Sequence, residues 1–314
     1  MELQEEDKPD VRKVVFVGLD NAGKTSIVLS LLREISKFAV IKPTRNAERR
    51  TFEFLGMEIS EWDLGGHERY RFLYLEKAQL IFARTDIVIY VVDVQDYDRI
   101  AESYIYLNDI INKLTEIGLN PPIHIFFHKN DPDVTENLSI KINDTISFLK
   151  GKVEDLQNYN KFSFHKTTVF DLSSIINAMS EILLSLFPKS KVIEKAIQEF
   201  VIKSGVEGVE LIDDNSLIIG SSYQSVYVKE RLNSLTPYFL KLNDGFKALE
   251  NIDNEDENYI IVERFDKYFI FKQFKLVAET TPYYILICTD EPFLNKDEFK
   301  ALINIIRDII SQEV

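Results

Sequence analysis

Cysteine is almost absent from the 314 residues, which contain Cys288 and no other. A disulfide within the chain and a metal site built on paired cysteines are therefore excluded, and a reducing cytoplasm is the expected setting. The sequence also lacks an apolar run of the roughly 18 residues that a membrane-spanning helix needs. Its opening segment, MELQEEDKPD, is acidic rather than signal-like. These absences predict a cytoplasmic protein that is neither secreted nor integral to a membrane.

Positive charge is scarce, with 37 Lys and Arg against 51 Asp and Glu and a net charge of −14. Residues 1–188 carry 22 basic and 29 acidic side chains, and residues 189–314 carry 15 and 22, so each part has a charge of −7. Nucleic-acid binding needs a basic face, so we expect no nucleic-acid partner. The hydrophobic content of 45% and the chain length predict two ordered domains.

Short apolar runs alternate with segments of helical period through residues 11–188. This pattern predicts an α/β domain, a mostly parallel sheet with helices on both faces. Strands are expected at 13–18, 52–63, 86–93, 122–127 and 162–166, and helices at 24–37, 68–83, 98–117, 135–157 and 171–187. Pro188 ends the last helix, so the first domain is expected to span residues 1–188.

The pattern changes in residues 189–314, which form the expected second domain. Helices are expected at 191–204, 228–249 and 296–312, and strands at 207–221 (two), 259–264, 268–278 and 283–289. This order predicts a smaller α+β domain, an antiparallel sheet with its helices mainly on one side. All four histidines precede Lys166 and no second phosphate loop follows. We therefore expect a dimerisation domain, with a monomeric appendage as the alternative.

The strongest motif is GLDNAGKT at residues 18–25, which fits GxxxxGK[S/T] between an apolar strand and a helix. In such a loop the backbone N–H groups turn toward phosphates, Lys24 reaches the β and γ oxygens, and the Thr25 hydroxyl binds magnesium. A glycine turn without a ligand is the alternative. The nucleotide-binding residues predicted here are Gly18, Asp20, Asn21, Ala22, Gly23, Lys24, Thr25 and Ser26.

A second motif, DxxG, begins at Asp63 at the end of another apolar strand, 38 residues after Thr25. Asp63 is predicted to hold magnesium through a water, and the Gly66 backbone N–H to bond the γ-phosphate. Thr44 lies between the two motifs on a polar stretch where a switch loop belongs. Its hydroxyl is predicted to complete the magnesium shell in the triphosphate state, and Thr51 is the competing residue.

A base-reading motif, HKND at residues 128–131, follows the last strongly apolar strand of this part. Asp131 accepts from both guanine N1–H and N2–H, which adenine does not offer, and the Lys129 stem lies over the ring. His128 stands where most small GTPases have asparagine. Thr168 follows a later strand, where a loop closes over guanine, although a helix N-cap region is an equal alternative.

These motifs resemble the Arf, Sar and Rag group of small GTPases. GLDNAGKT and the pair Pro43–Thr44 resemble Arf and Sar proteins, DLGGHE at 63–68 resembles Sar, and HKND resembles the HKxD form of Rag proteins. Arf and Sar proteins end after the G domain, whereas Rag proteins continue into a roadblock-type dimerisation domain, whose element order matches that expected after residue 188. The sequence is thus identified as a Rag-like GTPase with Arf-like switch motifs, typical of an early-branching, archaeal lineage.

The resemblance implies Mg²⁺ as cofactor, GTP or GDP as bound nucleotide, and slow hydrolysis in the absence of a partner. It implies a homo- or heterodimer through the second domain, with roadblock-like proteins, activating factors and exchange factors as partners. It also implies that His67, in place of the usual glutamine, orients the attacking water. An exposed histidine without hydrolysis is the alternative.

A direct lipid anchor is not expected, since Glu2 stands where Arf proteins have the myristoylated glycine and the C-terminal SQEV lacks cysteine. Recruitment to membranes would then depend on partners. Two other functions stay open. One is a scaffold that binds nucleotide permanently without hydrolysing it, and the other is an ATP-binding switch.

Overall fold

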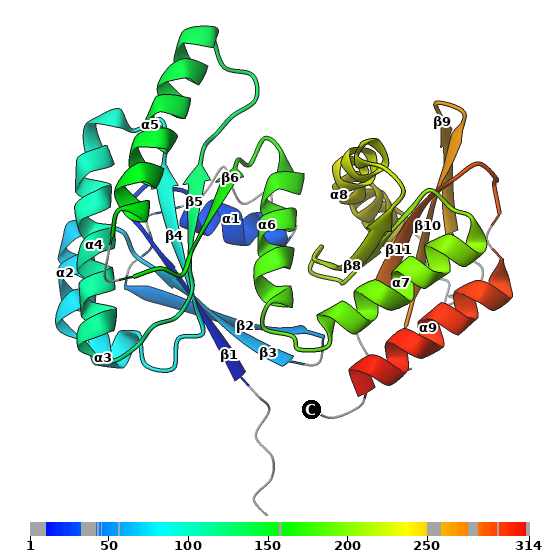
Figure 1. The fold of residues 1–314 in the computed structure, drawn as a ribbon, viewed down its shortest axis with the longest axis horizontal. Helices are drawn as coiled ribbons and strands as arrows, with labels where there is room; N and C mark the ends of the chain where they lie inside the picture. The colour runs from blue at the N-terminus through cyan, green and yellow to red at the C-terminus, as the bar shows by residue number, and fades with distance from the viewer. Residues whose placement is uncertain are drawn as a thin grey trace, which may run out of the picture. The chain divides into compact units, whose positions relative to one another are not determined.

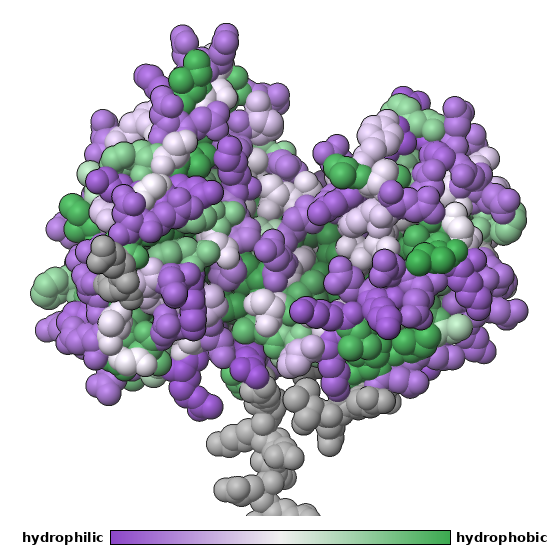
Figure 2. Space-filling view, viewed as in Figure 1, coloured by the Kyte–Doolittle hydropathy of each residue, from purple (hydrophilic) through white to green (hydrophobic). Residues whose placement is uncertain are grey.

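The computed structural model describes residues 11–32, 42, 44, 46–55, 57–156, 159–249, 259–275, 282–293 and 295–311. The chain divides into two compact units (Figure 1). The first unit comprises Met1–Ser30 and Ile35–Asp171, and the second comprises Leu31–Glu34 and Leu172–Val314. Hydrophilic side chains predominate on the face of each unit drawn in Figure 2. In the described part, no helix is long and apolar enough to cross a membrane.

The first unit is built on a six-stranded sheet with the order β2-β3-β1-β4-β5-β6. All neighbouring strands are parallel except β2 and β3. The strands are β1 (Val11–Val17), β2 (Ala47–Phe54), β3 (Met57–Leu64), β4 (Ile87–Asp93), β5 (Ile123–His128) and β6 (Phe162–Thr167). The central strands are buried on both faces, as expected of a parallel sheet covered by helices.

Helices of the first unit lie on both faces of this sheet (Figure 1). They are α1 (Lys24–Leu31), α2 (Glu68–Glu76), α3 (Ala78–Ile81), the short 3-10 helix η2 (Tyr97–Arg99), α4 (Ile100–Glu116) and α5 (Glu136–Glu154). In α4, Leu107, Ile110, Ile111 and Leu114 recur at helical spacing and are buried in one core with Val88 of β4. The predicted mostly parallel α/β domain is therefore confirmed.

Two predicted elements of the first unit were wrong in detail. The single strand expected at 52–63 is a hairpin, β2–β3, with Phe54 opposite Met57. Leu55 turns the chain with a φ of +51°, a conformation that leucine rarely adopts and that sequence patterns do not signal. The helix expected at 68–83 is broken at Lys77 into α2 and α3. Pro43, quoted in the motif above, lies outside the described residues.

The second unit contains a five-stranded antiparallel sheet with the order β8-β7-β11-β10-β9. Its strands are β7 (Gly208–Ile212), β8 (Ile218–Tyr223), β9 (Tyr259–Arg264), β10 (Lys267–Phe274) and β11 (Tyr283–Thr289). Its helices are α6 (Leu172–Leu184), α7 (Ser190–Ser204), α8 (Val226–Leu249) and α9 (Lys296–Ser311). The predicted antiparallel α+β arrangement is therefore present.

Helices cover both faces of this second sheet, so the prediction that they lie mainly on one side was wrong. A Cβ on Gly208 would touch Val228 and Leu232 of α8, whereas one on Gly220 of β8 would touch Ile197 of α7. Every residue of β7 and β11 is consequently buried. Residues of β9 are mostly exposed, and β10 is buried only in its middle part.

The limit between the two units differs from the predicted boundary at Pro188. Helix α6 belongs to the second unit, where Ile176 packs in the core with α8. The Ser180 hydroxyl oxygen also accepts a hydrogen bond from the Ile218 backbone N–H at 2.8 Å. A proline ends a helix but does not decide on which core that helix packs, and the division of the chain by contacts falls before α6 and not after Pro188.

A carboxyl group is buried inside the second unit. Glu210 of β7 is fully buried and accepts hydrogen bonds from the Thr236 hydroxyl and, at 2.9 Å, from the Tyr223 hydroxyl. Burial raises the pKa of Glu210 to about 7, against the opposing effect of these two hydrogen bonds. Both oxygens of this carboxyl group are thus satisfied within the fold.

Candidate functional site

The loop between β1 and α1 follows a path that depends on glycine. Gly18 has a φ of +146° and Gly23 a φ of +97°, and Asn21 between them has a φ of +60°. A Cβ on Gly18 would lie 2.3 Å from the Val91 carbonyl oxygen of β4, so no larger residue fits. Asn21 is exposed, whereas Ala22 is buried. The loop is therefore fixed against the end of β4.

Lys24 points back into this loop from the first turn of α1. Its side chain is 5% exposed, and its ammonium donates to the Gly18 carbonyl at 3.1 Å and the Leu19 carbonyl at 2.8 Å. Burial lowers the pKa of Lys24 to about 8, and the nearby Asp63 and Asp20 carboxylates oppose that shift. Ser26 follows in the same turn and its carbonyl accepts from the Ser30 hydroxyl. The loop thus encloses a positive charge.

Three oxygen-bearing side chains from separate segments meet beside Lys24. The Thr25 hydroxyl donates to Asp63 Oδ2 at 2.6 Å and lies 3.0 Å from the Thr44 hydroxyl, which is itself 3.3 Å from Asp63 Oδ2. Asp63 is fully buried at the end of β3, and its Oδ1 has no hydrogen-bond partner among the described residues. Oxygen ligands of this kind are those that Mg²⁺ prefers.

Gly66 brings the second motif against the phosphate loop. A Cβ at Gly66 would lie 2.2 Å from the Asp20 backbone nitrogen and 2.4 Å from the Leu19 carbonyl oxygen. Only a glycine therefore permits this close approach. His67 follows at the N-cap of α2, where its side chain is exposed, makes no capping hydrogen bond, and meets the edge of the Tyr70 ring at 6.4 Å between centroids.

The base-reading residues lie at the ends of β5 and β6. Asp131 accepts from the Thr168 hydroxyl on Oδ1 and from Gln95 Nε2, at 2.8 Å, on Oδ2. Lys129, with a φ of +60°, donates from Nζ to Asp93 Oδ2 at 2.6 Å. Gln95 Nε2 also donates to the Lys129 carbonyl at 2.7 Å. The structure therefore brings Lys129, Asp131 and Thr168 together and adds Gln95.

His128 is enclosed between the phosphate loop and β6. It is 1% exposed, its Nδ1 lies 3.0 Å from the Thr167 hydroxyl, and a Cβ on Gly23 would lie 2.3 Å from its ring. Burial lowers the pKa of His128 to about 4, so the ring is neutral at pH 7. Its observed contacts hold the loop to the sheet, a contribution that the motif alone does not reveal.

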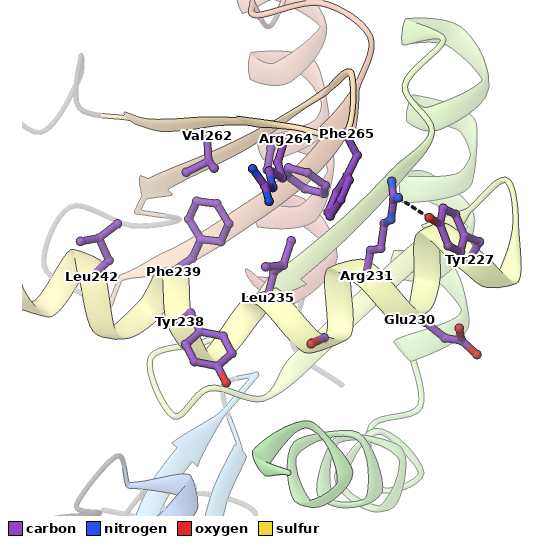
Figure 3. Close-up of a pocket in the computed structure, with 12 residues that line it drawn as sticks. Tyr227, Glu230, Arg231, Leu235, Tyr238, Phe239, Leu242, Val262, Arg264 and Phe265 are labelled. Carbon is purple, nitrogen blue, oxygen red and sulfur yellow. Dashed lines mark hydrogen bonds between the residues drawn. The ribbon is translucent and has the colours of Figure 1, made fainter. Parts of the chain in front are cut away.

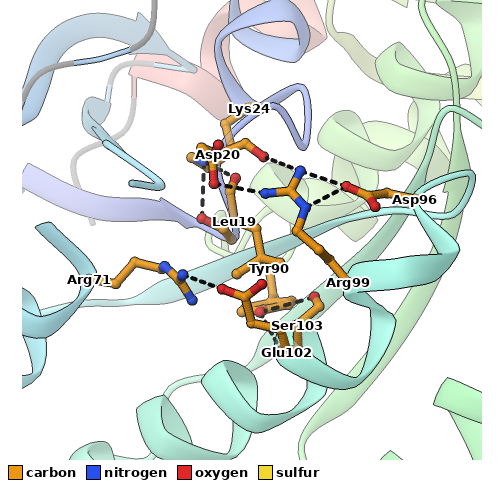
Figure 4. Close-up of polar contacts among 10 residues, drawn as sticks. Leu19, Asp20, Lys24, Arg71, Tyr90, Asp96, Arg99, Glu102 and Ser103 are labelled. Atoms are coloured by element: carbon orange, nitrogen blue, oxygen red, sulfur yellow. Dashed lines mark hydrogen bonds and ion pairs between the residues drawn. The ribbon is translucent and has the colours of Figure 1, made fainter. Parts of the chain in front are cut away.

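Arg99 of η2 is a second residue that sequence reasoning missed. Its Nη1 donates to Asp20 Oδ1 at 2.9 Å, its Nη2 to the Asp20 carbonyl at 3.3 Å, and its Nε to Asp96 Oδ2 at 2.7 Å (Figure 4). Neither Arg99 nor Gln95 belongs to a recognised motif here. The chain offered no signal for them beyond their place shortly after β4.

The site as a whole lies where the parallel strands of the first unit end. Residues after β1, β3, β4, β5 and β6 contribute to it, as is usual for ligand sites in open α/β sheets. One end carries the glycine loop, an enclosed ammonium and the oxygen cluster, which suits phosphates and a divalent cation. The other end carries a carboxylate held by neighbouring donors, which suits a base with two N–H groups.

The chain is similar in sequence to a family of G proteins. The family described as the Gtr1/RagA G protein conserved region matches residues 13–244. ADP-ribosylation factor-like protein 3 of Chlamydomonas reinhardtii is 31% identical over 119 residues, which cover 38% of this chain and 63% of that relative's length. The Arl6 (BBS3) small GTPase of Trypanosoma brucei, solved with the nucleotide analogue GppNp, is 20% identical and gives a TM-score of 0.42, covering 55% of this chain and 95% of that one.

Proposed function

Because the chain belongs to the Gtr1/RagA family of G proteins, within the Arf/Rag group of small GTPases, we propose that its first unit is a switch that binds GTP or GDP with Mg²⁺ and slowly hydrolyses GTP. The observation that carries this proposal is the meeting of Thr25, Thr44 and Asp63 beside the enclosed Lys24. These groups come from three segments far apart in the sequence. Their convergence is what a metal-bound nucleotide requires.

The donor set fits a magnesium ion. The two hydroxyls and the carboxylate are hard oxygen ligands, and the buried Asp63 Oδ1 lacks a donor among the described residues, a costly arrangement that a cation would relieve. Thr25 and Thr44 would hold the ion directly, and Asp63 through a water. When bound, the ion neutralises negative charge on the phosphate oxygens.

The rest of the site would bind the nucleotide itself. Lys24 would exchange its bonds with the loop carbonyls for phosphate oxygens, which are stronger acceptors. The Gly66 N–H lies at the loop and would bond the γ-phosphate, which links the second switch to the nucleotide state. Asp131 would read guanine through N1–H and N2–H, with Lys129 and Thr168 beside it.

Slow hydrolysis is proposed because the described site residues include no arginine directed at the transferred phosphate. The exposed His67 at the start of α2 is free to turn toward an attacking water and orient it. An activating partner that supplies an arginine would add roughly 10³ to 10⁵ in rate. In that stimulated reaction His67→Ala should lower turnover while leaving GDP affinity unchanged.

Purified chain tests the switch against the scaffold alternative. We expect fluorescent GDP and GTP to bind in Mg²⁺, to dissociate faster after chelation with EDTA, and to outcompete adenine nucleotides. A single-turnover assay with labelled GTP should then yield GDP plus phosphate at a slow but measurable rate. Binding without any turnover, alone or with cellular extract, would instead favour the non-hydrolysing scaffold. Absence of nucleotide binding would refute both.

For the second unit we propose a roadblock-like dimerisation domain. Beyond β9 the described residues provide no further strand, and Tyr259, Ile261 and Val262 on this edge are exposed. A groove of about 510 Å³ runs between α8 and the β9–β10 hairpin, and Leu235, Phe239 and Val262 point into it (Figure 3). An open apolar edge of this kind tends to pair with another chain.

A second copy or a roadblock-like partner would cover this edge around a two-fold axis. Light scattering of the full chain at tens of micromolar should give the mass of a dimer, and Ile261→Lys should reduce it to that of a monomer. Ile305→Lys, at an exposed position of α9, is the matched control. A monomer in the wild type would exclude the homodimer and leave pairing with a different partner. In the cytoplasm, such partners would also account for recruitment to membranes.

A further inference from the structure

The phosphate loop contains a negative charge of its own. Asp20 lies within the loop, 45% of its side chain is exposed, and its carboxylate acts electrostatically on the enclosed Lys24. A bound nucleotide places phosphate oxygens in the same loop. An unneutralised carboxylate there would repel them, and would repel the more highly charged triphosphate more strongly than the diphosphate.

Arg99 neutralises this carboxylate from outside the motif. Its guanidinium meets both the side chain and the backbone carbonyl of Asp20, at 2.9 and 3.3 Å, and is itself held by Asp96 at 2.7 Å (Figure 4). Because η2 begins shortly after β4, the arginine projects from a fixed part of the sheet. Because Arg99 bonds to two groups of Asp20, it holds that residue in one orientation and also neutralises its charge.

The residue that Arg99 holds is also the one on which the second switch rests. A Cβ on Gly66 would lie 2.2 Å from the Asp20 backbone nitrogen, so the two backbones are in direct contact. A displacement of the Asp20 peptide would move the surface against which Gly66 lies. Arg99 therefore affects both the net charge of the loop and the position of the backbone against which Gly66 packs.

We propose that Arg99 is a positioning residue that neutralises Asp20 and thereby sets the preference of the site for triphosphate over diphosphate. This inference rests on the proposed nucleotide-binding function and adds a residue that touches neither phosphate nor metal. Removal of Arg99 releases a carboxylate beside the phosphates. Its effect must disappear when that carboxylate is removed as well, and this dependence separates the proposed role from a structural one.

The test measures the affinities of the full chain for GDP and for the non-hydrolysable triphosphate GppNHp, in excess Mg²⁺. Arg99→Ala should weaken GppNHp binding about tenfold and GDP binding about twofold, as expected for a charge several ångströms away in a partly solvated site. Asp20→Ala should not lower the ratio of the two affinities. The double variant Arg99→Ala, Asp20→Ala should restore that ratio to within about twofold of the wild-type value.

Lys113→Ala, which removes a surface ion pair with Glu116 on α4, is the control and should leave both affinities unchanged. Equal weakening of GDP and GppNHp in Arg99→Ala would overturn the inference, as would a double variant that keeps the altered ratio. The wild type is measured first. Failure of the wild type to bind either nucleotide would refute the proposed function itself. If the wild type binds both nucleotides and Arg99→Ala leaves both affinities unchanged, this inference alone is refuted.

Discussion

Two fully buried carboxyl groups, Asp63 in the first unit and Glu210 in the second, have opposite surroundings. In the first, Asp63 is fully buried with Oδ1 lacking a partner among the described residues, and Lys24 bonds to backbone carbonyls alone. In the second, Glu210 is equally buried but both of its oxygens receive hydroxyl donors. Unsatisfied buried groups are rare and call for an explanation. The difference between these two carboxyl groups indicates that Asp63 is available to a ligand, whereas Glu210 serves the fold of its own unit.

The two sheets also differ in the direction of their strands. Parallel strands in the first bring the ends of five strands to one edge, where loops from distant parts of the sequence meet. Antiparallel strands in the second alternate in direction, and helices cover both faces of the centre. Strands β8 and β9 end the second sheet, and the residues of β9 are the more exposed of the two. The first unit thus gathers polar side chains at one edge of its sheet, whereas the second leaves a mostly exposed strand at an edge of its own.

The largest expected effect comes from Lys24→Ala. The substitution removes the enclosed positive charge, and truncating one partner of a buried charge pair typically weakens binding by about 30-fold to more than 1000-fold. Fluorescence titration with labelled GDP measures the change. Lys77→Ala, at an exposed lysine at the end of α2, should leave the affinity unaltered. Wild-type affinity in Lys24→Ala would place the phosphates elsewhere.

A smaller but more specific change is expected from Asp131→Asn. The amide presents a donor to guanine N1–H in place of an acceptor, so GDP affinity should fall by about 100-fold or more while xanthosine diphosphate binds better. Competition between the two nucleotides measures the switch. Asp133→Asn, at an exposed neighbour, is the control. Unchanged selectivity would remove Asp131 from the base site.

Glu210 in the second unit and His128 in the first should contribute to stability with opposite dependence on pH. Burial raises the pKa of Glu210 to about 7, so between pH 4.5 and 7 the folded state keeps a proton that the unfolded state releases, and this contribution to stability is lost as pH rises. Burial lowers the pKa of His128 to about 4, so its contribution is lost as pH falls from 6.5 to 4. Each contribution should amount to about 3 kcal/mol.

Native-state hydrogen exchange of β7 peptides and β5 peptides, followed from pH 5 to pH 7, separates the two units. Glu210→Gln should flatten the pH response of β7 and leave that of β5 intact, and His128→Asn should do the reverse. Asp213, whose pKa burial also raises to about 7, keeps part of the slope in the second unit, and His124 of β5, whose pKa burial lowers to about 4, keeps part of it in the first. Burial also raises the pKa of Glu61 in the first unit to about 7, so that group opposes the two histidines. Parallel responses of both units to either variant would contradict the contrast.

The smallest expected effect belongs to Gln95→Ala. The amide donates to both Asp131 and the Lys129 carbonyl, so its loss should loosen the base-reading carboxylate and lower GDP affinity by about fivefold. Calorimetric titration measures this change. The loss should shrink to less than twofold in an Asp131→Asn background, because the two residues act together. Additive losses would mean that Gln95 acts independently of Asp131.

Sequence patterns predicted the order of elements well and their packing less well. Apolar runs bounded by polar turns marked β1, β4 and β5, which are buried on both faces, so their existence did not depend on partners. The β2–β3 hairpin was missed because its turn uses Leu55 at a positive φ instead of a turn-forming residue. Helix α6 falls on the other side of the division from the one expected, since contacts across the fold, such as that of Ile176 with the second core, decide where a helix packs.

In the candidate site, too, residues in local motifs could be predicted from sequence, whereas residues placed by contacts distant in the sequence could not. Residues 18–25 and 63–66 follow strand ends in recognised spacings, so they were found from sequence. Gln95 bonds to Asp131, 36 positions away, and Arg99 bonds to Asp20, 79 positions away. Neither residue belongs to a motif that predicts its contact. The enclosed position of His128 was likewise hidden, because its contacts with Gly23 and Thr167 exist only after the sheet has formed.

The sole tryptophan of the chain, Trp62, precedes Asp63 and has two cations near its ring. Lys13 Nζ lies 3.8 Å from the ring centroid and the Arg49 guanidinium lies 3.6 Å from it. Indole emission responds to the electric field across the ring. Burial and the nearby Arg49 lower the pKa of Lys13 to about 8, so the fluorescence should change as that ammonium loses its proton. Because Arg49 belongs to β2 and Lys13 to β1, any shift of one strand against the other alters the same signal. In the proposed switch, Trp62 would therefore act as an intrinsic fluorescent probe, and unlabelled protein should report nucleotide exchange by its emission alone.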